Sequence, residues 1–161
     1  MIRRSFLALT GLLLAGPAAA QQPPLKVALI YSKTGPLEAY ARQTEAGFML
    51  GLEYATKGTM EVDGRKIQVI LKDDQFKPDV GKARSEKLVQ QDKVNFIGGY
   101  IWSNVLLASY KTVVDEGDTI LVSANAGPSQ IAGELCNKNF FSTSWQNDQT
   151  PMAMGEYLNT K

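Results

Sequence analysis

Histidine is absent from the sequence, and cysteine occurs only once, at Cys136. Without histidine, the chain lacks the base of Ser-His-Asp and Cys-His nucleophile arrangements and a ligand of the usual zinc sites. A single cysteine also excludes a disulfide within the chain. Cys136 is therefore a thiol whose partner lies elsewhere, a free thiol, or a small buried hydrophobic residue.

The sequence also has no excess of charge, with 17 basic and 16 acidic residues. A near-neutral surface offers no electrostatic attraction to nucleic acid or to an anionic membrane. Motifs of nucleotide-binding proteins and hydrolases are missing as well. No Gly-x-Gly-x-x-Gly follows the first predicted strand, Gly81-Lys82-Ala83 is not a phosphate loop, and Ser103 is not within Gly-x-Ser-x-Gly. We therefore expect no nucleic-acid partner, no cofactor, no metal and no catalytic residues.

The apolar stretch near the N-terminus, Phe6–Gly16, is too short for a membrane span, which requires about 20 apolar residues. Arg3 and Arg4 precede this stretch, and the small residues Ala18-Ala19-Ala20 follow it. This order predicts a signal peptide over residues 1–20, cleaved after Ala20, rather than a membrane anchor. The arginine pair also fits a twin-arginine signal, so two export routes stay open.

Residues 21–161 alternate between strand and helix patterns, which predicts one α/β domain. Compact apolar runs of strand length occupy residues 25–31, 65–71, 94–99, 119–123 and 139–144. Helical patterns occupy residues 38–54, 78–89, 103–115 and 151–158, with a helical turn at 129–132. Asp63-Gly64 predicts a hairpin turn ahead of the second strand. Because strands that alternate with helices form right-handed crossovers, we expect a doubly wound parallel sheet.

Three loops follow predicted strand ends, at residues 32–36, 99–104 and 124–129. In an open parallel sheet, ligands bind beyond the carboxyl ends of the strands. Ser103 lies at the start of a predicted helix, where unpaired N–H groups and the helix dipole favour a carboxylate. Its hydroxyl can donate a further hydrogen bond to such an anion. Alternatively, Ser103 only caps its own helix.

Other polar and aromatic residues near these strand ends have two interpretations each. Tyr100 and Trp102 can wall an apolar pocket, or they can pack beneath their loop. The segment Asn125–Gly127 offers amide donors to a ligand, or it forms only a turn. Asp73 and Asp74 point to opposite faces of a strand, so we expect a solvated strand end rather than paired acids.

Several stretches of the mature sequence occur in an order shared with a known protein family. They are Lys26–Ile30 with Thr34–Pro36, Lys72–Asp74, Phe96–Gly99 with Ser103, and Ile120–Ser123. With them, residues 25–161 resemble the leucine-binding type of periplasmic binding protein, the receptor component of ABC importers for branched-chain amino acids and related solutes.

Other stretches resemble the branch of this family that includes binders of aromatic carboxylates. These stretches are Asn125–Ser129 and Phe140–Asp148. Trp102 stands where amino-acid binders often have serine, and Gly127 stands where they commonly have threonine. Both departures favour a flatter ligand.

The resemblance implies a type I periplasmic binding protein fold, in which two α/β lobes close on a ligand. Family members usually exceed twice this length, so the chain is expected to be a truncated N-terminal lobe. The second lobe and the later segment that completes the first lobe would be missing, together with a disulfide partner for Cys136. Half of the clamp would then be absent, and we expect weak affinity. The implied ligand-binding residues are Tyr40, Tyr100, Ile101, Trp102, Ser103, Asn125, Ala126 and Gly127.

The implied function is that of a monomeric periplasmic receptor that delivers a small organic carboxylate to an inner-membrane ABC permease. An aromatic acid is the favoured ligand, held at its carboxylate by residues 102–103 and 125–127 and at its apolar end by Tyr40 and Tyr100. A branched-chain amino acid, an amide or a urea is the alternative on the same fold. A hydrolytic enzyme is the remaining alternative, and the absence of histidine gives it no support.

Overall fold

The computed structural model describes residues 22–115 and 118–161. The predicted signal peptide therefore lies outside the described residues. Within the described ranges, no helix has both the length and the apolar character needed to cross a membrane.

Six strands form one sheet in the order β2-β3-β1-β4-β5-β6, and every pair is parallel except β2 with β3. The strands are β1 (Leu25–Tyr31), β2 (Glu61–Val62), β3 (Arg65–Asp73), β4 (Phe96–Gly99), β5 (Ile120–Ser123) and β6 (Phe140–Ser142). In the β2–β3 turn, Asp63 and Gly64 both have positive φ values, 50° and 75°, as a type I′ hairpin requires. The expected parallel sheet with an edge hairpin is confirmed.

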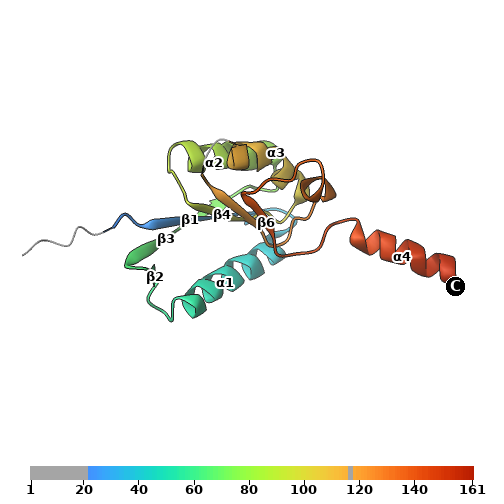
Figure 1. Ribbon diagram of the computed structural model, residues 1–161, viewed down its shortest axis with the longest axis horizontal. Coiled ribbons are helices and arrows are strands. Elements are labelled where there is room, and N and C mark those ends of the chain that lie inside the picture. The colour runs from blue at the N-terminus through green and yellow to red at the C-terminus, as the bar shows by residue number, and fades with distance from the viewer. Residues whose placement is uncertain (1–21, 116–117) are drawn as a thin grey trace, which may run out of the picture.

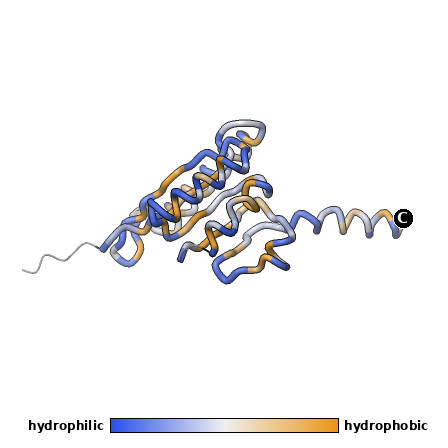
Figure 2. The backbone as a smooth tube through the Cα atoms, turned by 90° about the horizontal axis from the view of Figure 1, so that it is seen from above, coloured by the Kyte–Doolittle hydropathy of each residue, from blue (hydrophilic) through white to orange (hydrophobic). Residues whose placement is uncertain are grey.

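In the described residues, three α-helices and one short 3-10 helix lie between strands, and a fourth α-helix follows the last strand. They are α1 (Glu38–Ala55), α2 (Pro78–Gln90), α3 (Ser103–Asp115), η1 (Ser129–Ala132) and α4 (Gln149–Thr160). Helices α2 and α3 cover one face of the sheet and α1 lies on the other, which is the doubly wound arrangement (Figure 1). Helix α4 projects away from the sheet in two perpendicular views and has no buried residue (Figures 1 and 2).

The two faces of the sheet follow from the alternation of side chains along β1. Ala28 and Ile30 point toward α2 and α3 and join the larger core cluster with Leu106. Leu29 and Tyr31 point the other way and join a smaller cluster with Ala41 of α1. Two helices thus seal one face, while a single helix covers part of the other.

The chain reverses direction across the sheet between β1 and β4. From β1 it proceeds to β3 on one side and then returns to β4 on the other. Such a switch point separates the loops that follow the two strands and leaves a crevice at their carboxyl ends. Gly99 at the end of β4 has φ +103°, and a Cβ there would lie 2.1 Å from the Ile30 carbonyl oxygen. Only glycine permits this close approach of β4 to β1.

The structure excludes one of the three alternatives for Cys136. Its thiol is exposed, so it is not a small buried hydrophobic residue. It follows η1 in the segment that leads to the edge strand β6, where few elements are available to cover a side chain.

Candidate functional site

Backbone hydrogen bonds join the segments at the carboxyl edge of the sheet into one surface, which we call the rim. It comprises the end of β1 and the loops over residues 99–104 and 124–129. The Tyr100 N–H donates to the Ile30 carbonyl (2.6 Å), and the Ala126 N–H donates to the Tyr100 carbonyl (3.0 Å). The Ser123 hydroxyl at the end of β5 also donates to the Ala126 carbonyl. The end of β1 and the loops after β4 and β5 therefore lie in sequence along the edge, as expected for a parallel sheet.

Helix α3 begins in this rim and directs its N-terminus outward from the β4–α3 loop. Its first backbone hydrogen bonds run from the N–H groups of Val105 (3.1 Å) and Leu106 (3.2 Å) to the Trp102 carbonyl. The N–H groups of Ser103 and Asn104 precede these bonds and have no intrahelical acceptor. An anion at this point would meet two backbone donors and the positive end of the helix dipole.

Ser103 is the first residue inside α3, so it is not the residue that precedes and caps the helix. Its Oγ accepts a hydrogen bond from Asn147 Nδ2 at 2.9 Å. The hydroxyl is half-buried in the rim, next to the two unpaired N–H groups. This geometry favours ligand contact over the capping interpretation of Ser103.

A fourth loop, which follows β6, also contributes to the rim, and the sequence analysis did not identify it. The Asn147 N–H donates to the Gly127 carbonyl at 2.8 Å. A Cβ on Gly127 would lie 2.1 Å from the Trp145 carbonyl oxygen, so the two loops are in direct backbone contact. The rule that parallel strands end at one edge already implied this loop, because a strand was predicted just before it.

Trp102 stacks on an aromatic residue that the sequence analysis also missed. The rings of Trp102 and Phe76 lie 4.0 Å apart between centroids, at an interplanar angle of 21°. Phe76 belongs to the β3–α2 turn, where its N–H donates to Asp74 Oδ1 at 2.8 Å. The indole is therefore fixed against the turn that leaves β3, a strand separated from β4 by β1. No spacing in the sequence pairs residue 76 with residue 102, because the contact depends on strand order.

Tyr100 does not line an open pocket, contrary to the expectation. Its side chain is 0% exposed and belongs to the larger core cluster. The phenol oxygen lies 2.7 Å from Ser85 Oγ on α2, and burial raises the pKa of Tyr100. The alternative interpretation, packing beneath the loop, is the correct one, because α2 and α3 cover the sheet face to which this side chain turns.

The other residues predicted to bind the ligand differ in how far their side chains are exposed. Ile101 and Ala126 are buried, at 7% and 2% exposure, so they offer the rim mainly backbone groups. Tyr40 on α1 is 55% exposed, and Asn125 is half-buried. Tyr40 and Asn125 both border a cavity beneath α1.

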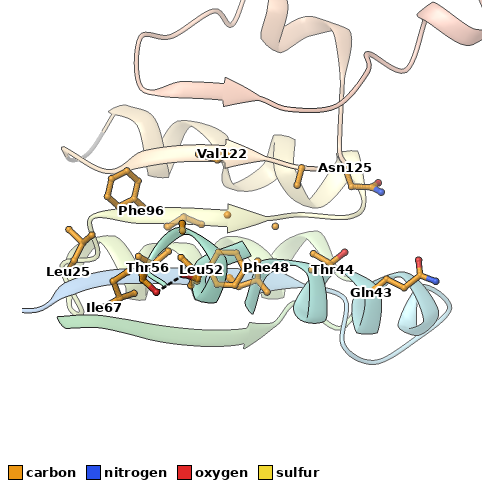
Figure 3. A pocket seen from close by; sticks show the side chains of 18 of the residues that line it. Leu25, Gln43, Thr44, Phe48, Leu52, Thr56, Ile67, Phe96, Val122 and Asn125 are labelled. Atoms are coloured by element: carbon orange, nitrogen blue, oxygen red, sulfur yellow. Dashed lines mark hydrogen bonds between the residues drawn. The ribbon is translucent and has the colours of Figure 1, made fainter. Parts of the chain in front are cut away.

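That cavity is an apolar trough of about 730 Å³ between α1 and the sheet, and it meets the rim at Gly99 and Asn125. Phe48 and Leu52 of α1 project over it, and Asn125 lies at the end of the trough nearest the carboxyl ends of the strands (Figure 3). Its floor consists of strand side chains such as Val27 and Phe96. Trp102 and Ser103 do not line it, and its walls carry few polar groups, so it resembles a packing surface more than a carboxylate site.

Asp73 and Asp74 occupy different environments, as expected, but only one of them is solvated. Asp73 accepts a hydrogen bond from the Thr34 hydroxyl at 2.7 Å. Although burial opposes ionisation, the hydrogen bonds from Thr34 and Gln75 hold the pKa of Asp73 below its usual range. Asp74 is 0% exposed, and burial raises its pKa. The expected solvated strand end is therefore wrong for Asp74, whose side chain turns inward beneath α2.

The rim combines several groups suited to one small carboxylate. Two backbone N–H groups, the Ser103 hydroxyl and the positive end of α3 lie together in the first turn of this helix, and the fixed Trp102 indole directly precedes them in the chain. Nothing among these groups supplies a base or a nucleophile pair. The arrangement can hold an anionic ligand and present an aromatic surface to the rest of it.

Known proteins are similar to this chain in sequence and in fold. A family model described as periplasmic binding protein matches residues 24–161. The leucine-, isoleucine-, valine-, threonine- and alanine-binding protein of Pseudomonas aeruginosa is 26% identical over 83% of this chain and 35% of its own length.

Two solved structures are similar to this chain in fold, and their sequences are more similar to it than that of the Pseudomonas aeruginosa protein. A protein of Rhodopseudomonas palustris described as an ABC-type branched-chain amino acid transporter is 51% identical, with a TM-score of 0.73, over 78% of this chain and 33% of its own. A solute-binding protein of an ABC transporter from Rhodopseudomonas palustris BisB5, in complex with 3,4-dihydroxybenzoic acid, is 30% identical. Its TM-score is 0.67, over 77% of this chain and 32% of its own.

This chain thus spans about a third of the length of the relatives that it matches. The shared region begins at β1 and includes the sheet, the rim and α4. Its α/β architecture agrees with the fold that the sequence resemblance implied. The chain belongs to the periplasmic binding protein family.

Proposed function

We propose that this protein is a periplasmic receptor of an ABC importer and that its rim binds a small organic carboxylate, with an aromatic acid favoured. The observation that carries the proposal is the N-terminus of α3, where two free backbone N–H groups lie beside the Ser103 hydroxyl. A helix N-terminus stabilises an anion through these donors and through the helix dipole.

The preference for an aromatic acid is supported by the Trp102–Phe76 stack next to this point. A fixed indole offers a flat apolar surface to a planar ligand. The related protein with bound 3,4-dihydroxybenzoic acid adds support, since it shares the fold and 30% of the aligned residues. Residues 102–103 and the backbone of 125–127 would hold the carboxylate, and Tyr40 would cover the ligand from α1.

The proposal also covers the export of the protein, its location and the delivery of its ligand. The N-terminal segment 1–20 acts as a cleaved signal peptide, and the protein works as a monomer in the periplasm. It passes its ligand to an inner-membrane permease and catalyses no reaction. A branched-chain amino acid is the second candidate ligand, because the Pseudomonas aeruginosa relative is named for such amino acids.

Titration followed by two-dimensional ¹H–¹⁵N NMR tests the proposed ligand class. Adding 4-hydroxybenzoate or 3,4-dihydroxybenzoate should shift the backbone amide signals of Ser103 and Asn104 in a saturable way, and leucine should do so less. Ser103→Ala removes one hydrogen bond to a charged group, worth about 1–2 kcal/mol. We therefore expect binding that is about 5- to 30-fold weaker.

The matched variant Ser103→Thr keeps the hydroxyl and should bind within a few-fold of the wild type. Saturable shifts with leucine alone would transfer the assignment to amino acids. Shifts confined to residues of the trough beneath α1 would remove the rim from the proposal altogether.

A further inference from the structure

Asn147 makes two hydrogen bonds that place its side chain against Ser103. Its backbone N–H donates to the Gly127 carbonyl at 2.8 Å. Its side-chain Nδ2 donates to Ser103 Oγ at 2.9 Å. Asn147 belongs to the β6–α4 loop, 44 residues beyond Ser103 in the sequence. The backbone bond anchors the residue, and the side-chain bond is directed at the one hydroxyl next to the α3 N-terminus.

The direction of the Asn147–Ser103 bond determines where the serine proton can point. A hydroxyl carries one proton and two acceptor lone pairs, whereas an amide nitrogen only donates. When Asn147 Nδ2 occupies a lone pair, the Ser103 proton cannot turn toward that nitrogen. A serine inside a helix often donates to the carbonyl four residues earlier, but Ser103 is the first residue of α3 and has no such helical carbonyl. The proton therefore has no acceptor within the helix and is available to a ligand.

We propose that Asn147 is a positioning residue of the rim: it holds the Ser103 hydroxyl so that its O–H donates to the carboxylate of the ligand. This inference rests on the proposed function, because it assigns a role at the same carboxylate site. Asn147 thereby joins the β6–α4 loop to ligand binding, in addition to the loops after β4 and β5.

A double-mutant cycle tests whether Asn147 acts through Ser103. The dissociation constant of 4-hydroxybenzoate is measured by the NMR titration for the wild type, Asn147→Ala, Ser103→Ala and the double variant. Alanine at residue 147 keeps the backbone bond to Gly127 and removes only the side-chain bond. We expect Asn147→Ala to weaken binding by about 2- to 5-fold in the wild type and to have no effect in the Ser103→Ala background.

A second variant reverses the direction of the hydrogen bond between residues 147 and 103 instead of removing it. In Asn147→Asp, a carboxylate accepts a hydrogen bond from the Ser103 hydroxyl and adds a negative charge beside the bound anion. Binding should weaken by more than about 10-fold. The control Asn159→Asp adds the same charge on exposed α4 and should bind within about 2-fold of the wild type.

The outcomes separate the two proposals. If the wild type binds 4-hydroxybenzoate but the effects of Asn147→Ala and Ser103→Ala simply add, Asn147 does not position Ser103. Equal losses for Asn147→Asp and Asn159→Asp would also overturn the role, because they would reflect net charge alone. If neither benzoate nor leucine shifts the rim amides of the wild type, the proposed function fails and this inference fails with it.

Discussion

Asp73 and Asp74 illustrate how much the properties of a residue depend on its side of a strand. The two carboxyls are adjacent in sequence, yet their pKa values shift in opposite directions. Hydrogen bonds from Thr34 and Gln75 reach the carboxyl of Asp73 at the rim. Asp74 turns inward, where burial penalises its charged form and outweighs the hydrogen bond from the Phe76 N–H.

The two acids should contribute to stability with opposite dependence on pH. The folded protein binds the Asp74 proton more tightly than the unfolded chain does, so this contribution is complete below about pH 4 and is lost as pH rises through the folded pKa. Asp74→Asn cannot titrate and keeps an oxygen for the Phe76 N–H. Relative to the wild type, the variant should therefore gain in free energy of unfolding as pH rises above about 4.

Asp73→Asn is the matched comparison with the opposite sign. A lowered pKa contributes stability that is present above the unfolded value, about 3.9, and lost as pH falls through the folded value. As pH rises from the folded pKa of Asp73 to about 3.9, the free energy of unfolding of this variant should fall relative to that of the wild type. Urea unfolding of all three proteins between pH 3 and 7 measures both trends, and parallel slopes for the two variants would contradict the assignment of environments.

At the scale of elements, the sequence predicted the framework well and its side-chain contacts poorly. The strand over residues 25–31, the helix over 103–115 and the turn over 129–132 occur at the predicted bounds, because apolar runs and helical spacing are local signals. The helix expected from Pro151 begins earlier, at Gln149, since proline is tolerated in a first turn where N–H groups have no helical acceptor.

The missed residues of the site share a different property. Phe76 and Asn147 reach the rim from loops that are distant in sequence, and their contacts follow from strand order and loop shape rather than from any spacing. Tyr100 was misplaced for a related reason. Its φ of +55° turns the chain at the strand end, and no pattern in one sequence reveals such a turn at a tyrosine.

Substitution of Gly127 should push apart the loops that follow β5 and β6. A methyl group there would meet the Trp145 carbonyl at 2.1 Å, and backbone cannot rotate away as a side chain can. We expect Gly127→Ala to lower the free energy of unfolding by about 1–3 kcal/mol, the range for overpacking. It should also move the Trp145 and Asn147 backbone amide signals in the NMR spectrum.

Gly51→Ala is the matched control, because a Cβ at this position in α1 would meet nothing within 4 Å. Replacing a glycine inside a helix should raise stability by about 0.5–1 kcal/mol. Chemical denaturation gives both values. A Gly127→Ala variant as stable as the wild type would show that the β5 and β6 loops are not in the contact described.

For the whole molecule, the unequal coverage of the sheet has a measurable effect. Helices α2 and α3 seal one face, whereas α1 leaves an apolar trough on the other. The side chains that line this trough therefore offer an apolar surface that an added apolar molecule can reach. A second exposed apolar group lies on α4, where Met154 and Leu158 are 56% and 67% exposed.

We expect the folded protein to bind 8-anilinonaphthalene-1-sulfonate in the trough, because this dye reports accessible apolar surface. Val62→Lys places a charge in the trough wall at a residue that is 44% exposed, so it should reduce dye fluorescence without unfolding the chain. Leu158→Lys makes the same change on α4 and should leave the fluorescence nearly unchanged. A loss of fluorescence only in Leu158→Lys would assign the dye to the helix instead.

The bonds that join the strand-end loops link main-chain atoms, from Tyr100 to Ile30, from Ala126 to Tyr100 and from Asn147 to Gly127. Loops held in this way should exchange their amide hydrogens slowly, unlike free surface loops. Little conformational entropy is then left to lose when a ligand binds, so affinity depends mainly on what the side chains offer. Because main-chain bonds survive most side-chain replacements, exposed rim positions such as Asn147 can change ligand preference while the frame that carries them stays in place.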